Sequence, residues 1–81
     1  MTIDHLTRYA RLLFGDRWQT QLAAALNLSE RTIRLWVHRG VAPDRYANQI
    51  HAALIDRMHE INSALDDIER DFSLAPTNNA A

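Results

Sequence analysis

Five side chains between positions 30 and 38 have the chemistry needed to contact the edges of DNA bases. The guanidinium groups of Arg31 and Arg34 can each pair with guanine O6 and N7, and the Glu30 carboxylate can accept from cytosine N4. Leu35 can contact a thymine methyl group. His38 is included because Arg31, Arg34 and His38 follow the i, i+3, i+7 spacing of one helical face. On a helix these five residues would share one outward face.

The same stretch has an apolar set on its other side. Ile33, Trp36 and Val37 follow the i, i+3, i+4 spacing of a helix and are expected to point into a core. An amphipathic surface helix with solvated arginines would show this pattern too. What favours base contact is the segment that comes before it.

Residues 19–28 predict a short helix followed by a sharp turn. Asn27 stands where a left-handed residue is needed, a conformation that Asn tolerates well. Ser29 is a good N-cap, and Glu30 in the first turn suits the helix dipole. Two helices joined in this way would share a small core, made by Leu22, Ala23, Leu26, Leu28, Ile33 and Trp36. The second helix would then be presented outward, at the right width for the DNA major groove.

The stretch from Arg17 to about Tyr46 resembles the lambda-repressor-like helix-turn-helix family, which includes Cro-type and small prophage regulators. The match runs through Gln19, Leu22-Ala23, Leu26-Asn27-Leu28-Ser29, Arg31, Thr32-Ile33 and Trp36. Gly is more usual at the position of Asn27, and the family usually has two shorter helices after the position of Pro43. The resemblance implies that Gln19 contacts a phosphate and that Glu30, Arg31, Arg34, Leu35 and His38 face the groove.

Further phosphate contacts are expected around the two helix ends. The full expected set is Gln19, Thr20, Ser29, Arg39 and Gly40. Gly40 would leave backbone N–H groups accessible beside Arg39. A plain helix end is the other interpretation of the same residues.

The chain is expected to be all-α: a compact helix-turn-helix domain of four helices within residues 1–72. The first helix is expected over Ile3–Phe14, with Thr2 as its cap and Gly15 as a left-handed end. Its buried side would be Ile3, Leu6, Ala10, Leu13 and Phe14. Asp16 and Gln19 resemble a capping box, with Trp18 and Leu22 inside. Pro43 suits the first position of the fourth helix.

The fourth helix, expected over about 44–72, has no Gly or Pro and would be roughly 40 Å long at 1.5 Å per residue. Its apolar residues step by 4, 3, 4, 3, 4, which is a heptad spacing. We name this set the seam: Leu54, Met58, Ile61, Leu65, Ile68 and Phe72. The first helix could cover its near part, around Ile50 and Leu54. The far part predicts a homodimer, parallel or antiparallel.

Charge is divided along the chain. Residues 1–45 hold seven Arg and four acidic residues, and residues 46–81 hold two Arg and six acidic residues. The cationic half contains the expected DNA-contacting helix, which suits a polyanionic partner.

Composition excludes several other classes. There is no cysteine for a disulfide or a thiolate metal site. There is no apolar run of the ~20 residues that a membrane span needs, so we expect a cytoplasmic protein. The resemblance to Cro-type and prophage regulators implies that it is bacterial or phage-encoded. Asp56, His59 and Glu60 share a helical face but are expected to be solvated, and no catalytic or cofactor motif is present. The tail, residues 73–81, is expected to be disordered.

These observations predict a sequence-specific DNA-binding regulator, most simply a homodimeric (auto)repressor on an inverted-repeat operator. One alternative is a DNA-binding antitoxin, whose tail or long helix neutralises a toxin. Another is a helical adaptor that uses the helix-turn-helix to bind protein. No enzymatic activity, metal or cofactor is expected.

Overall fold

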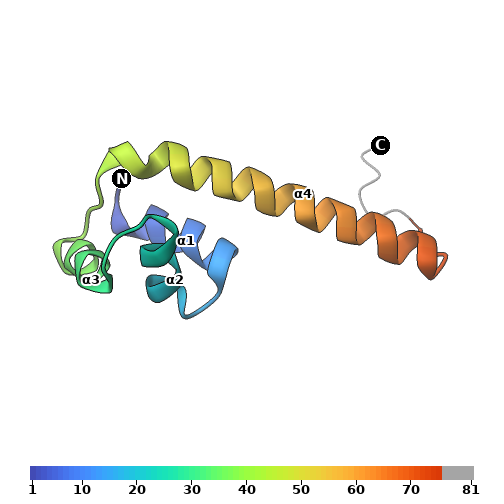
Figure 1. Ribbon diagram of the computed structural model, residues 1–81, viewed down its shortest axis with the longest axis horizontal. Coiled ribbons are helices and arrows are strands. Elements are labelled where there is room, and N and C mark those ends of the chain that lie inside the picture. Colours follow the sequence, from blue (N-terminus) through green and yellow to red (C-terminus); the bar gives the residue numbers. More distant parts are fainter. Residues whose placement is uncertain (76–81) are drawn as a thin grey trace.

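The computed structural model describes residues 1–75, and this part of the chain is all-helical, as predicted. Its elements are α1 (Ile3–Phe14), α2 (Trp18–Ala25), α3 (Glu30–Arg39), a short 3-10 turn η1 (Asp44–Tyr46) and α4 (Ala47–Asp71). Helices α1 to α3 form a small cluster at one end, and α4 runs over α1 and continues well past it (Figure 1). The molecule therefore measures 48 × 23 × 19 Å.

One apolar cluster holds the first three helices together. Leu6 of α1, Leu22 of α2 and Ile33 of α3 are its largest fully buried side chains. Around them lie Ala10, Trp18, Ala23, Leu26, Trp36, Ala42 and Ile50. The expected shared core of the helix-turn-helix is confirmed, although Leu28 is only partly buried.

The first helix has the predicted bounds and the predicted cap. The Thr2 hydroxyl accepts a hydrogen bond from the His5 amide at 3.3 Å. Gly15 ends the helix with φ 83° and ψ −158°. Its φ is positive, as expected, but its ψ is extended and not that of a left-handed helix.

The predicted capping box at the start of α2 is wrong. Helix α2 begins at Trp18, so Arg17 occupies the cap position, and it makes no side-chain capping bond. The register follows from burial: Trp18 and Leu22 are both inside the core. Asp16 therefore lies one residue too early to cap the helix.

A backbone pairing that the sequence did not suggest links the start of the chain to the loop after α3. The Ile3 amide donates to the Gly40 carbonyl at 2.9 Å, and the Ala42 amide donates to the Met1 carbonyl at 2.8 Å. Thr2 and Val41 form an antiparallel bridge. These bonds fix the loop that leaves α3.

The long helix starts later than predicted. Pro43 has an extended backbone, with ψ 136°, and precedes η1, so it is not the first helical residue. Helix α4 is then anchored on α1 by buried Ile50 and partly buried Leu54, as expected. The Arg57 guanidinium adds a hydrogen bond of 2.6 Å to the Leu13 carbonyl.

The end of α4 corrects the expectation of a disordered tail from residue 73. Ser73 adopts φ 55°, and the Leu74 amide donates to the Glu69 carbonyl at 2.8 Å. A left-handed residue followed by this bond is the Schellman type of helix end. The rest of the tail, residues 76–81, lies outside the described residues.

Trp36 provides a test of the packing. Its side chain is buried and its ring lies 5.3 Å from that of Tyr46. Trp36→Ala should lower the free energy of unfolding by about 3–5 kcal/mol, because it leaves a cavity in a small core. Urea unfolding followed by circular dichroism measures this. Val37→Ala on the same helix is the control and should change stability by less than about 0.5 kcal/mol; equal losses would contradict the packing.

Candidate nucleic-acid interface

Helix α3 is held in place at both ends by the residues that the sequence singled out. Asn27 has the predicted positive φ, 59°, and turns the chain out of α2. The Ser29 hydroxyl accepts from the Thr32 amide at 3.3 Å, which confirms it as the N-cap. At the other end Gly40 is left-handed, with φ 83° and ψ 3°.

The five residues expected to contact bases lie on one exposed face of α3. Glu30, Arg31, Arg34, Leu35 and His38 are all exposed. At 3.6 residues per turn they span a continuous arc of about 140°. We name this set the outward face.

Val37 lies outside the core, contrary to the prediction from the sequence. It was expected in the core with Ile33 and Trp36, but its side chain is 38% exposed. Rotation along the helix places it about 70° from the midpoint between those two side chains, close to the outward face. Val37 does follow Ile33 by four residues, but this spacing alone does not make its side chain buried.

Three of the expected contact residues meet at a shallow cavity where α2 and α3 begin. Gln19, Thr20 and Glu30 line it together with Asp16 and Arg17, and its volume is about 270 Å³. The Thr20 hydroxyl donates a hydrogen bond to the Glu30 carboxylate. In this conformation the hydroxyl proton is directed at Glu30 and is not offered to a phosphate.

In the loop after α3, the backbone amide of Gly40, which was expected to be accessible, is already hydrogen-bonded within the chain. The Gly40 amide donates to the Trp36 carbonyl at 2.9 Å, which is a helix end, the other interpretation of these residues. The exposed Arg39 side chain is the group at this site that remains able to reach a phosphate.

Two further arginines lie near the outward face, and they were not among the contact residues predicted from the sequence. Arg17 lines the cavity beside Gln19 and is exposed. Arg45 lies over the Tyr46 ring, 5.1 Å from its centroid, just after the loop that leaves α3. Their closeness to α3 depends on the fold, although the local excess of Arg in residues 1–45 pointed in this direction.

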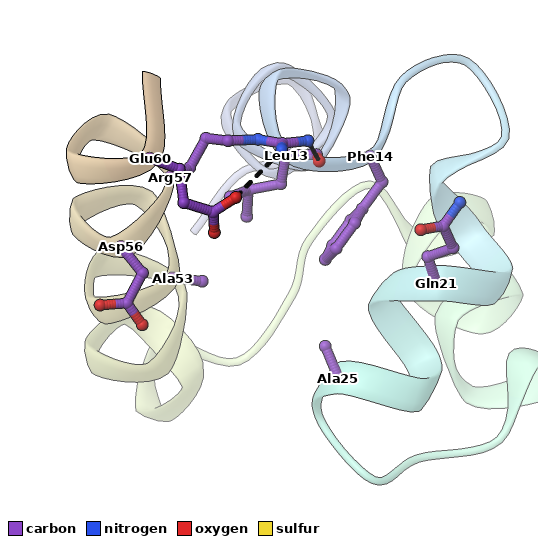
Figure 2. Close-up of a pocket in the computed structure, with 8 residues that line it drawn as sticks. All are labelled: Leu13, Phe14, Gln21, Ala25, Ala53, Asp56, Arg57 and Glu60. Carbon is purple, nitrogen blue, oxygen red and sulfur yellow. Dashed lines mark hydrogen bonds and ion pairs between the residues drawn. The ribbon is translucent and has the colours of Figure 1, made fainter. Parts of the chain in front are cut away.

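A second cavity, of about 400 Å³, lies between the end of α1, α2 and α4 (Figure 2). Arg57 reaches across it to the Leu13 carbonyl and lies 3.8 Å from the Glu60 carboxylate. The Arg57 guanidinium is thus already bound within the chain. The cavity lies where α4 packs against α1, and we assign it no ligand. Within residues 1–75 no group of three or more His, Asp or Glu is arranged to hold a metal ion.

Comparison with family models, curated proteins and solved structures finds no match to this chain. The resemblance to lambda-repressor-like regulators therefore rests on the residues named above. None of the helices in the described part is both long and apolar enough to cross a membrane.

The N-cap of α3 can be tested by itself. Ser29→Ala should lower the free energy of unfolding by about 1 kcal/mol, because it leaves the Thr32 amide without its side-chain acceptor. Ser63→Ala on the exposed surface of α4 is the matched control and should not destabilise the protein. Unfolding curves that coincide for Ser29→Ala and the natural sequence would contradict the capping role.

Proposed function

We propose that this protein is a sequence-specific double-stranded DNA-binding regulator that acts as a homodimer, most simply an (auto)repressor in the bacterial cytoplasm. The observation that carries the proposal is the outward face of α3. Buried Ile33 and Trp36 orient the helix, so Arg31 and Arg34 project away from the core. A rigid helix that presents two guanidinium groups is suited to guanine edges in the major groove.

Charge supports the same surface. The outward face lies in the half of the chain with three more basic than acidic residues, and Arg17, Arg39 and Arg45 are exposed near the ends of α3. These three would contact phosphates, whereas Arg31 and Arg34 would select bases. Glu30 works against phosphate binding and is better placed to accept from a cytosine amine.

The seam supports a homodimer. Met58, Ile61, Ile68 and Phe72 are exposed in the described chain, and they repeat at heptad spacing. Helix α4 itself continues well past the cluster formed by α1 to α3 (Figure 1). A second copy would bury them and would bring two outward faces to one DNA.

Base contact by α3 can be measured on a duplex enriched from a random pool by the natural protein. Arg31→Ala and Arg34→Ala should each weaken specific binding by about 1–3 kcal/mol in a gel-shift titration. Arg70→Ala, which removes an exposed arginine near the far end of α4, is the control and should bind normally. Wild-type affinity in both α3 variants would remove this helix from the proposed role. Absence of any salt-sensitive duplex binding would favour a protein-binding adaptor.

The homodimer makes a separate prediction about the operator. It should be an inverted repeat, with half-sites separated by one helical turn, roughly 10 bp, or a multiple of it. Ile61→Gln combined with Leu65→Gln should give monomers that bind weakly and without the contribution of a second half-site. Ser63→Gln, on the opposite face of the same turn, should remain dimeric. Sedimentation and footprinting measure both; a natural protein that is monomeric on a single half-site would contradict the dimer.

A further inference from the structure

The seam does not stop at Leu54 but leads into a groove. Continuing the heptad spacing toward the start of α4 gives positions 51 and 47. His51 and Ala47 both line a cavity of about 320 Å³, together with Ile50 and Leu54 of α4 and Met1 and Tyr9 of α1. Leu54 thus belongs both to the seam and to the groove. We name this cavity the α1–α4 groove.

At the other end, the seam finishes with the most exposed apolar side chain of the set. Phe72 is 71% exposed. It lies at the end of α4, followed by the turn that Ser73 and Leu74 close. One end of the seam therefore offers a large aromatic side chain, and the other end offers a largely apolar recess.

We propose that two copies of the chain pack their α4 helices antiparallel, with Phe72 of each copy at the mouth of the α1–α4 groove of the other. This inference rests on the homodimer of the proposed function and specifies its geometry. The seam fits this arrangement in one register without a gap. Leu54 meets Phe72 of the second copy, Met58 meets Ile68, and Ile61 meets Leu65.

Register distinguishes this arrangement from its neighbours. Each of the three pairs joins one heptad position to the complementary one, and their residue numbers have the same sum, so all six seam residues of each copy are paired. A shift by one heptad in one direction leaves Leu54 and Met58 without a partner on the second helix. In the other direction it sets Ile68 and Phe72 opposite His51 and Ala47, neither of which is a large apolar side chain. The two-fold axis passes at the level of residue 63, where Asn62 and Ala64 flank the seam and are small enough for close approach.

The groove argues against a parallel dimer. Parallel helices in register would place Ala47 opposite Ala47 and His51 opposite His51. Neither side chain is a large apolar group, so the groove would remain unfilled. Only the antiparallel arrangement brings an aromatic side chain of the seam to it.

Charge argues in the same direction. Residues 66–71 contain four acidic residues and Arg70, and a parallel dimer would align this segment with its own copy. Like charges held side by side are unfavourable. The antiparallel register places the segment beside residues 55–60, which contain Asp56, Arg57 and Glu60 and carry one net negative charge, so the repulsion is weaker than in the parallel dimer.

This geometry has a consequence for DNA. Helix α3 lies at the end of the molecule where α4 begins (Figure 1). From Asp44 to the axis at residue 63, a rise of 1.5 Å per residue gives roughly 28 Å, so the two ends are roughly 57 Å apart. That separation exceeds one turn of DNA, about 34–36 Å, and is nearer to two turns. The half-sites should therefore be about two turns apart.

The chain contains no cysteine, so single cysteines can report the register directly. Met58→Cys and Ile68→Cys alter side chains that are 49% and 47% exposed, which leaves the core intact. Each variant is oxidised alone, and the two are oxidised as a mixture, all without DNA. Because a disulfide needs Cβ atoms about 3.5–4.5 Å apart, we expect cross-linked dimer only in the mixture.

Every outcome of this experiment bears on the proposal. Cross-linking of either variant alone would show a parallel dimer and overturn the register, while the homodimer would stand. Failure of all three samples to cross-link would overturn the arrangement. Since no DNA is present, a failure here differs from a failure of the α3 variants to lose DNA binding.

The α1–α4 groove is tested by Phe72→Ala. We expect the dimer dissociation constant, measured by sedimentation, to rise roughly tenfold or more, because each dimer loses two buried aromatic side chains. Leu12→Ala is the control: its side chain on α1 is 62% exposed and lies outside both seam and groove, so dimerisation should not change. An unchanged dissociation constant for Phe72→Ala would overturn the role of the groove.

Discussion

The packing of three fully buried side chains, Leu6, Leu22 and Ile33, determines which face of α3 is exposed to solvent. Each comes from a different one of the first three helices, so the contact among them fixes all three orientations at once. With Ile33 and Trp36 inside, the arc from Glu30 to His38 can only face outward. The chemistry of the outward face therefore depends on a core that contains none of its residues.

The residues at the two ends of α3 fix the position of the helix along its axis, in addition to its orientation. Asn27 and Ser29 fix where the helix starts, and left-handed Gly40 fixes where it stops. The pairing of residues 1–3 with residues 40–42 then ties the exit loop to the start of α1. A helix restrained at both ends loses little further entropy on docking, which favours precise recognition over adaptable binding.

Local signals explain what the sequence could predict. The bounds of α1, the turn at Asn27 and the cap at Ser29 each depend on residues within one or two turns, and all three are confirmed. The face that carries Arg31 and Arg34 followed from the same periodicity. Base contacts and the choice of partner involve a second molecule, so they stay predictions.

Some features that the sequence did not predict come from contacts between distant segments, and others from the exact bounds of a helix. Val37 has the spacing of a core residue, but the width of the apolar contact excludes it. The Gly40 amide was expected to be accessible, yet it completes the helix end. Arg57 bonded to the Leu13 carbonyl, and the bridge between Thr2 and Val41, have no signature in either segment alone. Residues far apart in sequence decided these last two cases.

Helix α4 joins folding to assembly because a single stripe serves both. Ile50 and Leu54 pack that stripe against α1, and Met58 to Phe72 continue it into solvent. A domain this small buries too little apolar surface to be very stable alone. If a second copy binds along the stripe and at the α1–α4 groove, it stabilises the packing of α4 on α1 by mass action. The stability of the helix cluster would then rise with protein concentration, and α3 would be held most firmly in the dimeric form that we propose to bind DNA.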